Sequence, residues 1–142
     1  AGVLWVLAQL THVVYHAKGW NRSTVGVAIT HEGLRVSAID GETVPTVHRK
    51  TGRAMHQRLY APEDLEAAAY HVADILRRFC GKGAGDVDEC VKFHDALDAQ
   101  KNDPGRAFPR AAFRTAVAHI LLDRPQPVSW EDMARLPLQA AA

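Results

Sequence analysis

The chain lacks a long apolar run, a basic cluster and a framework of cysteines, and each absence excludes a class of protein. No stretch approaches the roughly 18 apolar residues of a membrane-spanning helix. A net charge of +1, with no Lys/Arg cluster interleaved with aromatic residues, gives no reason to expect nucleic-acid binding. Cys80 and Cys90 flank a glycine-rich segment, where they form either one small disulfide or two free thiols.

What the chain does contain is the composition of an ordinary globular domain. Hydrophobic residues make up 47% of the sequence and charged residues 23%. A length of 142 residues suffices for one domain with a real core and is too short for two of ordinary size. We therefore treat 1–142 as a single domain, in which 123–142 form a C-terminal tail. The apolar segment 1–10 lacks the basic start of a signal peptide and indicates a buried strand.

The first half of the chain is rich in strand-forming residues. Val and Leu dominate 2–15, and the strongly β-branched segment 24–30 (TVGVAIT) predicts a central strand. A further short strand is expected at 34–39. The next segment, 40–59, is polar and basic, so we expect a surface connection or the rim of a binding cleft.

The second half predicts two amphipathic helices. The first begins near Pro62, with acidic residues in its first turn, and continues through Arg78 with apolar residues at helical spacing. The second covers 108–122, and 130–136 suggests a last helical turn. Segment 88–93 is interpreted as a short strand. These elements predict an α/β fold with a mixed central sheet flanked by helices.

The strongest chemical signal is a histidine followed nine residues later by an aspartate, His94 and Asp103. The aspartate lies on a turn that a Pro-Gly pair forces, and Lys101 precedes it by two residues. Alone, the three would more often be a core histidine, a turn former and a solvated lysine. Together they predict a zinc site with a cation beside the metal, as hydrolysis requires.

Three motifs in order resemble the type 2 N-acetylmuramoyl-L-alanine amidases, a family that includes bacteriophage amidase-type lysozymes and is related to the peptidoglycan recognition proteins. Segment 16–29 (HAKGWNRSTVGVAI) resembles that family's substrate-cleft loop and central strand. Segment 60–65 (YAPEDL) resembles the start of its next helix, and 93–108 is similar to its late zinc-ligand segment. The similarity runs from about Gly2 to Leu122.

The resemblance implies a zinc-dependent hydrolase that cuts the amide between N-acetylmuramic acid and the L-Ala of the peptidoglycan stem. It implies His94 and Asp103 as Zn²⁺ ligands, and Lys101 as the residue that stabilises the oxyanion when water attacks the amide. Such an endolysin-like enzyme acts on the cell wall, in the periplasm, outside the cell or after release by a phage.

The same resemblance implies a lining for the glycopeptide cleft. Its expected members are His16, Lys18, Asn21 and Arg22. Positively charged hydrogen-bond donors at these positions would bind the carboxylates of the substrate.

The chain departs from the family pattern at two positions. The family's first zinc ligand is a histidine on an early strand, and the resemblance implies that this strand and the first helix lie before Ala1. The family's general base is a glutamate on the central strand, where this chain has Ala28, or an upstream tyrosine. Four alternatives stay open: preceding residues complete the site, His12 or His31 serves as a ligand, the domain binds peptidoglycan without zinc or hydrolysis, or an unrelated α/β domain carries these motifs by coincidence.

Overall fold

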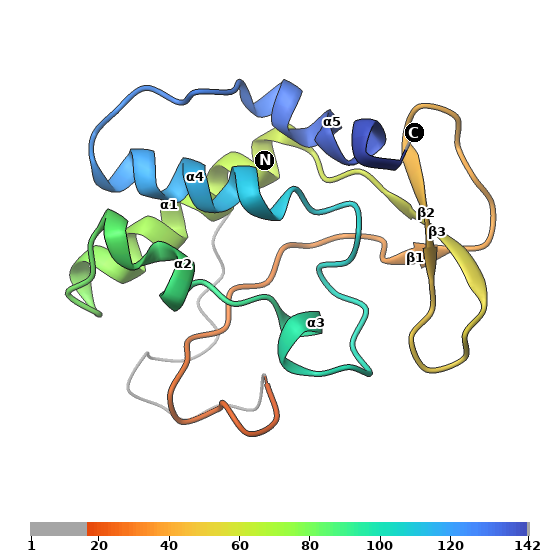
Figure 1. Cartoon of the computed structure of the whole chain (residues 1–142), viewed down its shortest axis with the longest axis horizontal. Coiled ribbons are helices and arrows are strands. Elements are labelled where there is room, and N and C mark those ends of the chain that lie inside the picture. The colour runs from red at the N-terminus through yellow and green to blue at the C-terminus, as the bar shows by residue number, and fades with distance from the viewer. Residues whose placement is uncertain (1–16, 142) are drawn as a thin grey trace.

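The computed structural model describes residues 17–141, which form a mixed α/β arrangement with helices beside a small sheet (Figure 1). The strands are β1 (Leu34–Arg35), β2 (Thr43–Val47) and β3 (Ala54–Arg58). The helices are α1 (Pro62–Arg78), the 3₁₀ turn η1 (Ala84–Asp86), α2 (Val87–Cys90), α3 (His94–Leu97), α4 (Arg110–Leu121) and α5 (Trp130–Ala141).

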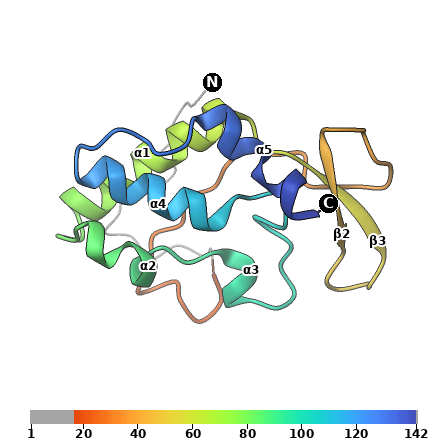
Figure 2. The same cartoon turned by 45° about the horizontal axis from the view of Figure 1, so that its top comes forward.

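The sheet has the strand order β1-β3-β2, and its strands are antiparallel. It lies at one end of the molecule, so the described residues form an antiparallel terminal sheet in place of the expected mixed, central one (Figures 1 and 2). Its main unit is a hairpin in which Thr43 pairs with Arg58 and Val47 with Ala54. Segment 40–59, which the sequence predicted as a surface connection or the rim of a cleft, is therefore largely a hairpin that its sequence did not predict.

The hairpin escaped prediction because its inward side chains are few and one of them is polar. Val44 is buried, and so is Gln57, while basic residues occupy the turn and the outer face. Pro45 fits on β2 because β2 is an edge strand of this sheet, where a missing N–H donor is tolerated.

Two predicted strands are absent from the described part of the chain. Segment 24–30 is irregular, and Val25 and Val27 are each 42% exposed. No segment within 17–141 pairs with it, and a strand needs such a neighbour for its backbone N–H and C=O groups. Segment 88–93 belongs partly to α2 and then runs extended without pairing, while 34–39 is a strand only at β1. The strands expected in 2–15 lie outside the described residues.

The two long helices follow the predicted periodicity. Helix α1 spans Pro62–Arg78 as expected, with Pro62 in its first turn, and α4 lies inside the predicted 108–122. They pack against each other, and α5 packs on α1, through a shared core that includes Leu65, Ala69, Phe113, Val117 and Met133. Helix α5 is longer than expected because its second half also buries an apolar side, at Pro137.

The structure bears on the state of the two cysteines, which the sequence left open, and on the expected lack of a membrane-spanning helix. Both cysteines are exposed free thiols, so the alternative of a Cys80–Cys90 disulfide is not realised. None of the helices within 17–141 combines the length and apolar character that crossing a bilayer needs.

Candidate metal centre

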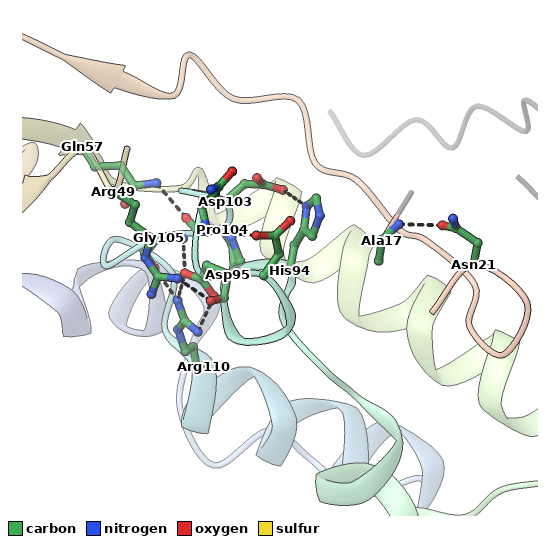
Figure 3. Close-up of polar contacts among 12 residues, drawn as sticks. Ala17, Asn21, Arg49, Gln57, His94, Asp95, Asp103, Pro104, Gly105 and Arg110 are labelled. Atoms are coloured by element: carbon green, nitrogen blue, oxygen red, sulfur yellow. Dashed lines mark hydrogen bonds and ion pairs between the residues drawn. The ribbon is translucent and has the colours of Figure 1, made fainter. Parts of the chain in front are cut away.

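The candidate centre is built on the segment that joins α3 to α4, which lies between the helices and the hairpin (Figure 2). His94 is the first residue of α3, and Asp103 lies on the turn that follows it. Their side chains meet, with 2.8 Å between Nδ1 of His94 and Oδ2 of Asp103 (Figure 3). A backbone hydrogen bond of 2.9 Å from Asp95 N to Asp103 O runs beside this contact. The structure thus brings the two predicted zinc ligands to one point.

The imidazole of His94 has one engaged and one unengaged nitrogen. An ionised carboxylate can only accept, so Nδ1 carries the proton that is shared with Asp103. Nε2 is buried and has no hydrogen-bond partner among the described residues. The side chain of His94 is 23% exposed and that of Asp103 is 68% exposed, so solvent and ions reach the pair from the Asp103 side.

Asp95, the neighbour of His94, anchors the turn from its buried side. Its side chain is only 3% exposed and forms a bidentate ion pair with Arg110, in which Nη1 donates to Oδ1 over 2.7 Å and Nη2 contacts Oδ2. The same carboxylate accepts a 3.2 Å hydrogen bond from Gly105 N. Sequence reasoning gave Asp95 no role, because its partner lies 15 residues away on another helix.

Two further side chains hold the carbonyl oxygen of Pro104. Gln57 Nε2 donates to it over 2.7 Å and the Tyr60 hydroxyl over 2.8 Å, while Gln57 Oε1 accepts from Ala107 N over 2.9 Å. Burial raises the pKa of Tyr60 well above its usual range, and the carboxylates of Asp103 and Asp95 raise it further, against an opposing effect of Arg110. Tyr60 therefore acts as a neutral hydrogen-bond donor that supports the turn.

Lys101 precedes Asp103 by two residues in the segment between α3 and α4. Its backbone N–H donates to Asp98 O over 3.1 Å, and its side chain is exposed and joins no ion pair within residues 17–141. An unpaired ammonium close in sequence to Asp103 is available to a negatively charged group of a ligand.

Three of the four predicted cleft residues, Lys18, Asn21 and Arg22, lie on a separate turn at 17–23. Asn21 Oδ1 accepts a 2.8 Å hydrogen bond from Ala17 N and so shapes this turn, and Figure 3 shows it on the side of His94 away from Arg110. Lys18 and Arg22 are exposed, and neither forms a hydrogen bond or ion pair with His94 or Asp103 within the described residues. His16 lies outside the described residues.

The donors fit part of a zinc site. An imidazole nitrogen and a carboxylate oxygen are both zinc ligands, and a catalytic site uses three protein ligands and one open position. Within 17–141 no group of three His, Cys, Asp or Glu side chains could hold a metal. The described residues therefore supply two of these three ligands, His94 and Asp103.

His31, one alternative third ligand, is already engaged. Its Nδ1 accepts from Gly33 N over 3.1 Å, so its Nε2 carries the proton and donates to Arg58 O over 2.9 Å. The ring also stacks on Tyr60, with 4.2 Å between centroids. His12, the other alternative, lies outside the described residues.

Comparison of the chain with protein-family models, curated proteins and solved structures finds no match. The family resemblance consequently depends on the motifs themselves.

Proposed function

We propose that this domain is a zinc-dependent amidase of bacterial peptidoglycan, which hydrolyses the amide between N-acetylmuramic acid and the L-Ala of the stem peptide. The observation that supports it best is the 2.8 Å contact of His94 with Asp103, the two residues that the motif assigns to zinc. Three buried side chains fix the turn that creates this contact: Asp95, Gln57 and Tyr60.

In this proposal the proton between Nδ1 of His94 and Oδ2 of Asp103 is displaced when zinc binds, so that these two atoms hold the ion, and Lys101 acts on the substrate. Zinc in such a site supplies a Lewis acid and lowers the pKa of a coordinated water toward neutrality. The ammonium of Lys101 donates to the amide oxygen, where negative charge develops in the transition state. Because this side chain has no competing ion pair in the described region, its charge is available for that oxygen.

The turn at 17–23 supplies the substrate contacts in the same proposal. Lys18 and Arg22 present exposed cations to the carboxylates of a muropeptide, and Asn21 holds the turn in shape. The third zinc ligand and the general base belong to residues outside 17–141.

The first test is the zinc content of the purified chain, measured by elemental analysis. About one zinc per chain is expected from the tetrahedral site, with loss of the metal in Asp103→Ala. Asp88→Ala removes an exposed carboxylate near the same segment and serves as the matched control that keeps its zinc. Zinc retained in Asp103→Ala would contradict the assignment of this ligand.

The second test separates hydrolysis from mere binding. Purified muropeptides are incubated with the chain, and release of peptides that begin with L-Ala is followed by mass spectrometry. Lys101→Ala is expected to abolish release while zinc stays bound, and Lys92→Ala, an exposed lysine of the same segment, should remain active. Co-sedimentation with peptidoglycan in the absence of zinc and of hydrolysis would favour the alternative of a non-catalytic binding module.

A further inference from the structure

We infer that Asp95 is the positioning residue of this centre, and that its ion pair with Arg110 fixes the His94–Asp103 contact. The expected loss of zinc affinity rests on the proposed function. The expected loss of the His94–Asp103 hydrogen bond does not, because it is measured in the protein without metal.

Asp95 connects both segments that carry the candidate ligands. It follows His94 directly in the chain, and its own N–H donates to Asp103 O over 2.9 Å. Its carboxylate accepts from Gly105 N, two residues beyond Asp103 (Figure 3). Backbone and side chain of one residue therefore hold the aspartate turn from both ends.

Arg110 ties this arrangement to a rigid helix. It is the first residue of α4, whose Phe113 and Val117 lie in the core against α1. Besides binding Asp95, its Nη2 donates to Gly105 O over 3.3 Å. The orientation of the turn is thereby set by a packed helix.

Helix α4 also fixes the path of the extended segment that precedes His94. The guanidinium groups of Arg110 and Arg114 lie 5.1 Å and 4.7 Å from the centroid of the Phe93 ring. Arg114 Nη2 also donates to Val91 O over 2.7 Å. The extended segment before His94 thus has a defined path although it pairs with no strand.

Asp95 is better suited to positioning than to binding a ligand itself. Both carboxylate oxygens are already occupied, and the side chain is 3% exposed. A buried ion pair often adds little net stability compared with apolar side chains of similar size. We therefore assign to the Asp95–Arg110 pair the role of orienting the turn.

The experiment compares Asp95→Asn with Asp74→Asn. The control removes a carboxylate from an exposed ion pair on α1, where Arg78 lies 2.7 Å from Asp74. In the zinc-free protein, nitrogen NMR of the histidine side chains reports whether His94 Nδ1–H stays hydrogen-bonded. Zinc affinity is measured by competition with a chelator, and far-UV circular dichroism checks folding.

Asp95→Asn is expected to lose the His94 Nδ1–H signal and to weaken zinc binding by about 10- to 100-fold, as for other residues that orient ligands. The helical spectrum should persist, and Asp74→Asn should match the wild type. Retention of both the signal and the affinity in Asp95→Asn overturns the inference.

Two outcomes separate this inference from the proposed function. A wild-type chain that binds no zinc refutes the metal assignment, while loss of the His94 signal in Asp95→Asn still supports positioning. If Asp95→Asn fails to fold, Arg110→Lys takes its place, because it keeps the charge and loses the bidentate geometry. Weakened His94–Asp103 contact is expected in Arg110→Lys, and an unchanged contact rejects the role.

Discussion

At Gly105 the backbone leaves no room for a side chain. Its φ is +78°, and a Cβ atom would lie 2.7 Å from Cδ of Gln57. This close approach lets Gln57 bind both Pro104 O and Ala107 N. The turn that presents Asp103 therefore depends on a residue without a Cβ.

Substitution of this glycine tests that dependence. We expect Gly105→Ala to lower the free energy of unfolding by about 2–4 kcal/mol, of which about 1–2 kcal/mol is left-handed backbone strain. Gly41→Ala is the matched control, since Gly41 has a φ of +69° and nothing within 4 Å of its Cβ position. Urea denaturation measures both variants, and equal losses would show that the Gln57 contact contributes nothing.

Tyr60 provides a pH-dependent prediction. Because burial and two carboxylates raise its pKa in the folded state, the unfolded chain ionises first, near the ordinary value of about 10. Above that pH the folded state binds more protons, so stability falls as pH rises, by about 1.4 kcal/mol per pH unit from this group. Below a pH of about 10 the full stabilising contribution of the protonated Tyr60 is present.

Comparison with Tyr60→Phe isolates this effect. At neutral pH the variant should lose about 1 kcal/mol, the net value of the hydrogen bond to Pro104 O. Raising the pH from about 9 to about 11 should shrink this difference or reverse its sign, since only the wild type carries the Tyr60 proton. A difference that stays constant over this range would refute the raised pKa.

At the scale of elements, the β2–β3 hairpin is attached to the candidate centre through its turn. Arg49 N donates to Asn102 Oδ1 over 2.9 Å, and the guanidinium of Arg49 bonds to Asp95 O. Figure 3 shows Arg49 beside Asp95 and Arg110. The hairpin thus supports the loop that carries Lys101 and Asp103.

Removal of the Arg49 side chain should loosen the segment 98–105, which carries Lys101 and Asp103. We expect Arg49→Ala to cost about 1 kcal/mol, the usual net value of such a bond, and to speed amide hydrogen exchange in 98–105. Lys50→Ala removes an exposed neighbouring cation and is expected to stay within about 0.5 kcal/mol of the wild type. Equal exchange rates in the two variants would contradict the support role.

At the scale of the whole molecule, the centre is assembled from three separate parts of the chain. The hairpin gives Gln57, the α3 segment gives His94 and Asp103, and α4 gives Arg110. A ligand held by this assembly stabilises the folded state by mass action.

Zinc should therefore raise the stability of the whole domain. At free zinc about 100-fold above Kd, the expected gain is about 2.7 kcal/mol, seen as a rise in Tm that a chelator reverses. Asp103→Ala should show no zinc-dependent rise, and calcium, which prefers six to eight oxygen ligands, should have no effect. A zinc-independent Tm in the wild type would contradict binding.

The long helices α1 and α4 and the order of the three motifs could be predicted from the sequence alone. Helical spacing of apolar residues is a local pattern, because each helix satisfies its own backbone hydrogen bonds. The turn at Pro104 and Gly105 could be predicted as well, because the turn preference of Pro and Gly is a property of the residues themselves. The β-branched segment 24–30 was misjudged, since a strand depends on a neighbour that propensity does not reveal.

The contacts that hold the centre together could not be predicted from the sequence and are seen in the folded chain. The Asp95–Arg110 pair, the hold of Gln57 and Tyr60 on Pro104 O and the docking of the hairpin turn join residues 15 to 53 positions apart. Such contacts leave no periodic trace in a sequence, because they arise from packing of one element on another. The chemical groups of the candidate site could be predicted from the sequence, whereas their relative positions depend on how the elements of the chain pack.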